Sequence, residues 1–148
     1  MDKHQTAALA FSTTDTPSAE ALLAVDEGLE AHNQAAAPLA DVRPMAAFAH
    51  DASGRLVGGT VGRTWGRCCE LQELWVDGAL RSQGMGSRLL QDFEAHARQR
   101  GCSVFYLTTL SFQAPDFYRR HGYGELARID GYPNSIVKYL MHKDERPA

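Results

Sequence analysis

The sequence predicts an α/β fold, because short apolar segments typical of strands alternate with segments whose apolar residues recur at helical spacing. The clearest strand is 71–76, a run dense in leucine, tryptophan and valine, as expected of a strand buried on both faces. The clearest helix begins at Met85, and Gly101 ends it as a C-terminal cap. A length of 148 residues predicts a single domain, 1–148, with a core of ordinary size.

The other elements follow from the same periodicities and from turn residues. A helix is expected over 17–33 with Ser18 as its cap, followed by a loop over 34–44. A hairpin with a glycine turn at Gly54 is expected to join two strands. The last residues, 143–148, are expected to form a flexible tail. The remaining expected elements are strands over 6–11, 45–50, 56–63, 104–108, 123–129 and 136–142, and a short helix over 115–121.

Composition narrows the class of protein. The net charge of −3, without a basic stripe, argues against nucleic acid as the main partner. The absence of a long apolar run or a signal-like N-terminus predicts no membrane span and a cytoplasmic location. Three cysteines, two of them adjacent, fit neither a disulfide framework nor a zinc site, so we expect no metal and expect the cysteines to pack as small strand residues.

A candidate anion site follows the central strand. Gly84 and Gly86 open the helix that begins at Met85, where free backbone N–H groups and the helix dipole favour a phosphate. Arg81 adds a mobile positive charge. The dinucleotide-binding pattern fails, because Leu89 stands where a third glycine is needed. Glycines that merely permit positive φ angles in an ordinary loop are the alternative interpretation.

Two blocks of sequence resemble one known family. The pattern Arg81-x-x-Gly84-x-Gly86, after a strand and before a helix, resembles the acetyl-CoA pyrophosphate loop of the GCN5-related N-acetyltransferases, the GNAT family. The segment 114–123, with an alanine, a Phe-Tyr pair, a glycine and a tyrosine, resembles a later motif of that family. The resemblance covers roughly residues 20–142. It implies a mixed, mostly antiparallel, twisted central sheet of six to seven strands flanked by about four helices.

The resemblance also implies where acetyl-CoA would bind. The pyrophosphate loop would hold the diphosphate, and main-chain groups of the central strand would pair with the pantetheine arm. The amide of Leu74 would face the thioester oxygen. Ser111 stands where the family commonly has an asparagine that holds the cofactor arm, so either Ser111 or Gln113 would take its place. The expected cofactor-binding residues are Leu74, Trp75, Val76, Arg81, Ser82, Gln83, Gly84, Met85, Gly86, Ser87, Ser111 and Tyr118.

Catalytic candidates are a phenol and two carboxylates. By resemblance, Tyr118 is the general acid that protonates the CoA sulfur, the alternative being that it only packs the helix. Glu70 and Glu73 are candidate bases on the central strand. Being three residues apart, they are expected to point to opposite faces, so that only one lines the acceptor pocket. Glu73 is preferred, because a carboxylate inside so apolar a run is costly to bury. The alternative is that both are solvated or ion-paired.

The resemblance therefore implies an N-acetyltransferase that moves the acetyl group of acetyl-CoA to a primary amine, which we expect to belong to a small molecule. Two alternatives stay open. One is acetylation of lysine side chains or N-termini of proteins, and the other is a non-catalytic acyl-CoA-binding sensor. Arg119 and Arg120 either reach the 3′-phosphate of the cofactor or form a solvated basic face. Family members often dimerise through sheet edges, so a homodimer is also considered.

Overall fold

The computed structural model describes residues 8–148, and these divide after Leu39 into two compact units, 8–39 and 40–148. The first unit contains the helix α1 (Ala19–Ala36), and Ser18 caps it as predicted, its Oγ accepting a hydrogen bond from the amide of Ala21 at 3.1 Å. The helix ends three residues later than expected, at Ala36, and takes up the start of the expected loop. Residues 8–11 form no strand, and the rest of the expected first strand lies outside the described residues.

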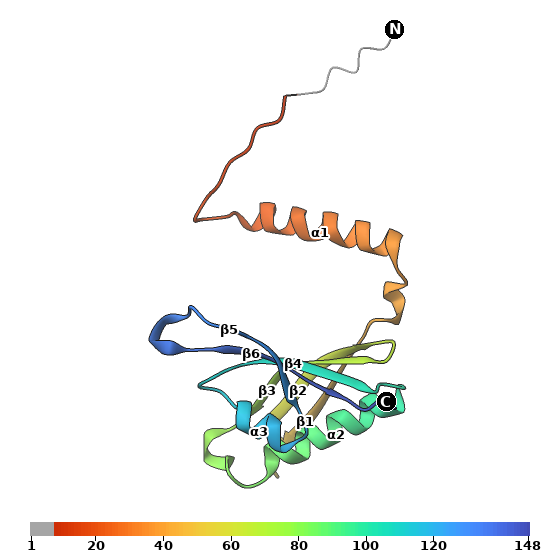
Figure 1. The fold of residues 1–148 in the computed structure, drawn as a ribbon, viewed down its shortest axis with the longest axis vertical. Helices are drawn as coiled ribbons and strands as arrows, with labels where there is room; N and C mark the ends of the chain where they lie inside the picture. The colour runs from red at the N-terminus through yellow and green to blue at the C-terminus, as the bar shows by residue number, and fades with distance from the viewer. Residues whose placement is uncertain (1–7) are drawn as a thin grey trace. The chain divides into compact units, whose positions relative to one another are not determined.

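The second unit is built on one twisted sheet with the strand order β1-β2-β3-β4-β6-β5 (Figure 1). Neighbouring strands are antiparallel except β3 and β4, which are parallel. The predicted mixed, mostly antiparallel sheet is confirmed, with six strands and three α-helices in the described residues. The strands are β1 (Arg43–His50), β2 (Leu56–Trp65), β3 (Cys68–Val76), β4 (Val104–Leu110), β5 (Gly124–Ile129) and β6 (Lys138–Asp144).

Two helices pack against one face of this sheet, α2 (Met85–Gln99) and α3 (Pro115–Arg120) (Figure 1). The apolar face predicted for α2 is buried, with Leu90 and Phe93 almost fully enclosed. Tyr118 of α3 and Met141 of β6 belong to the same hydrophobic cluster. Both helices therefore pack against the strands in one continuous hydrophobic core. The described part of the chain also contains three short 3-10 helices: Leu39–Asp41, Gly78–Leu80 and Pro133–Ser135.

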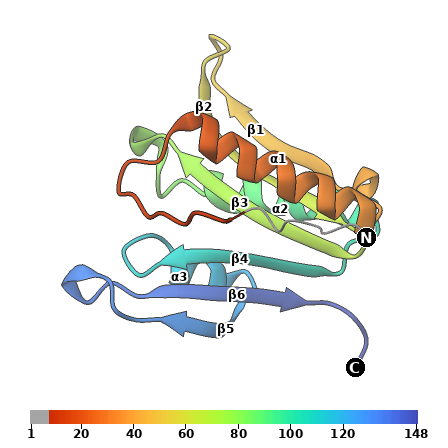
Figure 2. The same ribbon diagram turned by 90° about the horizontal axis from the view of Figure 1, so that it is seen from above.

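The parallel strands β3 and β4 pair over only a short length. Their register runs from Cys68 opposite Val104 to Glu70 opposite Tyr106, and no further pair follows. Beyond Glu70, β3 keeps its pairing with β2, and β4 keeps its pairing with β6. The two strands therefore diverge, as Figure 2 shows. The divergence leaves main-chain groups on the facing edges without a strand partner.

A β-bulge interrupts β3 just beyond this point. In the register with β2, Leu71 lies opposite Gly62 and Glu73 lies opposite Val61, so Gln72 is an extra residue without a partner. Gly62 is required here, because a Cβ at that position would lie 2.0 Å from the carbonyl oxygen of Glu70. The bulge shifts the side-chain alternation of β3 by one residue.

The chain end and the cysteines differ in part from expectation. Strand β6 continues to Asp144, and Glu145 accepts a 2.8 Å hydrogen bond from Arg98, so the expected tail at 143–148 is wrong for its first residues.

Cys69 and Cys102 are buried, whereas Cys68 is exposed. Among residues 8–148, no helix is long and apolar enough to cross a bilayer.

Candidate functional site

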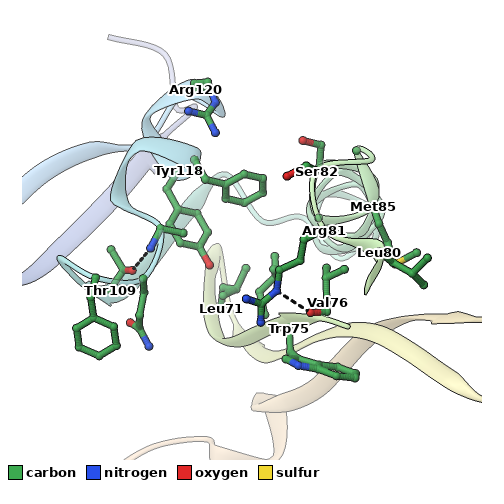
Figure 3. Close-up of a pocket in the computed structure, with 18 of the residues that line it drawn as sticks. Leu71, Trp75, Val76, Leu80, Arg81, Ser82, Met85, Thr109, Tyr118 and Arg120 are labelled. Atoms are coloured by element: carbon green, nitrogen blue, oxygen red, sulfur yellow. Dashed lines mark hydrogen bonds between the residues drawn. The ribbon is translucent and has the colours of Figure 1, made fainter. Parts of the chain in front are cut away.

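A cleft of about 850 Å³ opens where β3 and β4 diverge, between the beginning of α2 and the helix α3 (Figure 3). Its floor comes from the two strands, and its rim comes from the loop before α2 and the loop before α3. The lining residues are Leu71, Gln72, Leu74, Trp75, Val76, Leu80, Arg81, Ser82, Gly84, Met85, Gly86, Ser87, Thr108, Thr109, Phe112, Gln113, Ala114, Phe117, Tyr118 and Arg120.

The beginning of α2 presents unpaired backbone donors to the cleft. Gly84 caps the helix with φ +81° and supplies no side-chain hydrogen bond. The amide of Arg88 is bonded to the carbonyl of Gly84 at 3.1 Å, so the amides of Met85, Gly86 and Ser87 precede the first bond of the helix. Three adjacent donors at the positive end of a helix dipole form an anion site.

Space for an anion is available beside these donors. Gly86 carries no side chain, and a Cβ there would point toward the ring of Phe117 at 3.6 Å and toward Val76 at 3.9 Å. Both of these neighbours line the cleft. The bare backbone at Gly86 therefore keeps the cleft open next to the helix N-terminus, as a bulky diphosphate requires.

Two arginines supply positive charge to the cleft and a third does not. The Nε of Arg81 donates to the carbonyl of Val76 at 3.1 Å, which draws its guanidinium over the end of β3 (Figure 3). Arg120 also lines the cleft. Arg119 lies outside the lining and forms ion pairs with Asp116 at 2.6 Å and Glu125 at 3.7 Å. Of the two arginines considered for a cofactor phosphate, only Arg120 is at the cleft.

Tyr118 projects from α3 into the cleft (Figure 3). Its ring packs edge-on against the rings of Phe117 and Tyr123, with centroids 5.1 Å and 5.8 Å away. The residue is 7% exposed, and burial raises the pKa of its phenol to about 12. A phenol with so high a pKa stays protonated at neutral pH and is available as a proton donor.

The two strand carboxylates share one face of the sheet, contrary to the sequence prediction. Glu70 lies opposite Arg63 and Glu73 lies opposite Val61, and these two β2 residues are two apart and so point the same way. The bulge at Gln72 is the cause. In a regular strand, side chains three residues apart point to opposite faces, but the extra residue brings Glu70 and Glu73 onto the same face. Neither glutamate lines the cleft.

Their surroundings differ. Glu70 is half-buried and accepts a 2.8 Å hydrogen bond from the Nε of Arg63. Glu73 is exposed and forms no ion pair within the described part of the chain, residues 8–148. The carboxylate of Glu70 is therefore engaged by a guanidinium, whereas that of Glu73 has no such partner in residues 8–148.

Of the two side chains considered for the place of the family's asparagine, Gln113 lines the cleft and Ser111 does not. Ser111 lies outside the lining, and its Oγ accepts a 3.0 Å hydrogen bond from the amide of Val137. Gln113 lines the cleft, with its Oε1 accepting from the amide of Leu110 at 2.8 Å. That bond leaves the amide nitrogen of Gln113 available as a donor.

Most of the residues expected to bind the cofactor line the cleft, along the end of β3 and at the beginning of α2. Gln83 and Ser111 lie outside the lining. The β4 side was missed, because Thr108, Thr109 and Phe112 carry no motif and reach the cleft only through the divergence of the strands. Thr109 is buried, and its Oγ1 accepts from the amide of Ala114 at 3.5 Å, which fixes the loop before α3.

Comparison with known proteins finds similarity to acetyltransferases. Residues 13–123 match the model of the "Acetyltransferase (GNAT) family". A blasticidin-S acetyltransferase of Streptomyces morookaense is 40% identical over 111 residues, which are 72% of this chain and 82% of that protein. An acetyltransferase of Agrobacterium fabrum is 32% identical over 119 residues, covering 80% of this chain and 87% of the relative.

The fold agrees as well. The crystal structure of an acetyltransferase from Bacillus cereus superimposes with a TM-score of 0.75 at 24% identity, covering 90% of this chain and 97% of the other. At that identity the likeness concerns the fold alone.

Proposed function

The chain belongs to the GNAT family of acetyltransferases and is an acetyl-CoA-dependent N-acetyltransferase, and on this premise we propose that its acceptor is the amine of a small molecule. The observation that carries the proposal is the similarity to blasticidin-S acetyltransferase, which extends over most of both chains.

The cleft residues fit the parts of CoA in turn. The free amides of Met85, Gly86 and Ser87 suit the diphosphate, and Arg81 lines the same cleft. The edge of β3 over Leu74, Trp75 and Val76 suits the amide groups of the pantetheine arm, which would pair with it as an added strand does. Arg120 suits a further phosphate at the rim.

Acetyl-CoA supplies the acetyl thioester, and the residues of this chain move the protons. The phenol of Tyr118 would donate its proton to the sulfur as the C–S bond breaks. The amide of Leu74 would donate to the thioester oxygen, where negative charge develops. The acceptor must lose a proton before its nitrogen attacks, and Glu73, directly or through water, would accept it.

The position of the carboxylates favours a cationic acceptor. Glu70 and Glu73 share a face of β3, and Glu73 has no cationic partner within residues 8–148. An ammonium group approaching along this face would be attracted to the unpaired carboxylate. The charge of Glu73 would thus serve both to attract the protonated amine and to deprotonate it.

The test is a thiol-release assay with acetyl-CoA and a panel of amines, with products identified by mass spectrometry. The panel contains blasticidin S, an aminoglycoside, a polyamine and a lysine-containing peptide. We expect turnover with at least one of the small amines and much weaker turnover with the peptide. Turnover with the peptide alone would instead support protein acetylation. CoA binding without turnover on any acceptor would support the sensor alternative.

A further inference from the structure

Ser87, in the first turn of α2, is hydrogen-bonded to a histidine from another helix. Its Oγ lies 2.9 Å from the Nε2 of His121, which follows α3. Ser87 lines the cleft at the proposed diphosphate position, whereas His121 lies outside the lining. The two residues are 34 positions apart in sequence. The contact therefore connects the beginning of α2 to the end of the helix that carries Tyr118.

His121 is held firmly in this position. Its amide donates to the carbonyl of Tyr118 at 3.0 Å, and its carbonyl accepts from the Nζ of Lys143 at 3.1 Å. Its ring packs against the ring of Phe117, with centroids 4.8 Å apart. The residue is half-buried. A fixed imidazole can impose a direction on the hydroxyl of Ser87, which would otherwise rotate freely.

The proton on Nε2 decides which way the Ser87 hydroxyl points. When Nε2 carries no proton, it accepts the hydrogen of Ser87, and the serine then presents only lone pairs to the cleft. When Nε2 is protonated, it donates to Oγ, and the serine O–H is free to donate to a phosphate oxygen. A doubly protonated imidazole also adds a positive charge behind the diphosphate.

The charged groups around His121 come from three elements. Arg119 and Arg120 precede it on α3, and Arg119 is already ion-paired. On β6, Lys143 contacts the carbonyl of His121 and forms an ion pair with Glu94 of α2. An anion bound at Ser87 would add a negative charge next to the imidazole of His121.

We infer that His121 is a positioning residue for the diphosphate of CoA: its Nε2–H turns the Ser87 hydroxyl toward the phosphate, and CoA binding favours the charged imidazole. This inference rests on the proposed binding of the diphosphate at the beginning of α2. Its consequence is that CoA binding is accompanied by proton uptake. The affinity for CoA is then higher at pH 6 than at pH 8 by more than the cofactor itself accounts for.

The test is isothermal titration calorimetry of the whole protein with CoA at pH 6 and pH 8, in buffers of different ionisation enthalpy. His121→Gln retains an N–H donor but has no titrating group, and His121→Phe retains the ring but has no donor. His96→Gln, in the last turn of the same helix as Ser87, removes an exposed histidine remote from the cleft and is the matched control. Any protonation of CoA itself contributes equally to all four proteins.

We expect the wild type and His96→Gln to bind CoA more tightly at pH 6 than at pH 8. This ratio of affinities should exceed the same ratio for His121→Gln by about threefold or more. The number of protons taken up on CoA binding should also be larger in the wild type and His96→Gln than in His121→Gln. His121→Phe should bind CoA about tenfold more weakly at pH 6, and adding Ser87→Ala to it should cost little more. Equal pH dependence in the wild type and His121→Gln would overturn the inference, as would unimpaired binding by His121→Phe. If the wild type bound no CoA at either pH, the proposed function would fail too.

Discussion

Glu70 and Tyr106 form the last directly opposed pair of residues in β3 and β4. Burial raises the pKa of the Tyr106 phenol, and the charge of Glu70 raises it further. On its other side, Glu70 is ion-paired with Arg63 at 2.8 Å. Glu70 is therefore a cross-strand link at the point where the strands part, whereas Glu73 lies beyond that point on the same face.

This difference predicts unequal roles for the two carboxylates. We expect Glu73→Gln to lower kcat by about 10²-fold, the lower end of the range for loss of a general base. Glu70→Gln should lower kcat by much less, because its carboxylate is held by Arg63. Steady-state kinetics with the best acceptor and saturating acetyl-CoA measure both effects.

Glu70→Gln serves as the matched control, since it removes the same charge from the same face of the same strand. Thermal unfolding of both variants checks that the sheet is intact. A larger loss of kcat in Glu70→Gln than in Glu73→Gln would reverse the assignment. Equal, small losses would mean that a water molecule or another group accepts the proton.

Tyr118→Phe tests the proposed proton donor. Removing the hydroxyl should lower kcat by about 10²-fold and leave the affinity for CoA little changed, because the ring contacts with Phe117 and Tyr123 remain. The phenol pKa is raised to about 12, so the donor is present throughout neutral pH and is lost only as the pH rises toward that value. The pH profile of kcat in the wild type should therefore show no loss from this group below about pH 10. A phenylalanine variant with full activity would reduce Tyr118 to a packing role.

Gly62→Ala tests the bulge that orients the carboxylates. The new Cβ would lie 2.0 Å from the carbonyl oxygen of Glu70 and 2.8 Å from the ring of Phe93, so the strands must move apart. We expect a loss of about 3 kcal/mol in the free energy of unfolding, at the upper end for overpacking. Urea denaturation measures it. Gly124→Ala is the control, since its Cβ would meet nothing within 4 Å, and it should change stability by less than about 0.5 kcal/mol.

The three cysteines should react with a thiol reagent at very different rates. Cys68 is exposed, whereas burial raises the pKa of Cys69 to about 12 and raises that of Cys102 as well. Because the thiolate is the reactive form, the native protein should show one fast thiol, and all three should react after denaturation. Cys68→Ser should abolish the fast phase. A fast phase that persists in this variant would show that a buried cysteine becomes accessible.

The elements that the sequence predicted well have local signals. The helix α2 is marked by Met85 at its beginning and Gly101 at its end, and periodic apolar residues lie between them. The hairpin turn is marked by Gly54, which adopts φ +85°. The glycine segment at the beginning of α2, where we propose that the diphosphate binds, is one such local segment, so the sequence alone could point to it.

The features that the sequence did not predict depend on pairing between distant residues. The bulge at Gln72 is visible only in the register with β2, and without it the faces of Glu70 and Glu73 are assigned wrongly. Likewise, the hydroxyl of Ser111 is bonded to Val137, so Gln113 is the side chain that reaches the cleft. The contact between Ser87 and His121 joins two helices that no sequence pattern relates.

Lys143 shows the energetic consequence of one further pairing of this kind, at the chain end expected to be a flexible tail. Its Nζ forms an ion pair with Glu94, whose side chain is only 4% exposed and also accepts a 2.9 Å hydrogen bond from the Tyr123 hydroxyl. Lys143→Met would leave a buried carboxylate with Arg98 3.9 Å away as its remaining cation. We expect a loss of about 3 kcal/mol in the free energy of unfolding, measured by urea denaturation.

The double variant Lys143→Met/Glu94→Gln isolates the cause. Removing the charge of Glu94 should restore part of the lost stability, because a buried amide without a cation costs less than a buried carboxylate. Lys138→Met, at the other end of β6, controls for the loss of one lysine and should be near neutral. If Lys143→Met were as stable as Lys138→Met, Arg98 and the Tyr123 hydroxyl would be sufficient to stabilise the charge of Glu94, and the end of β6 would contribute only through its backbone pairing with β4.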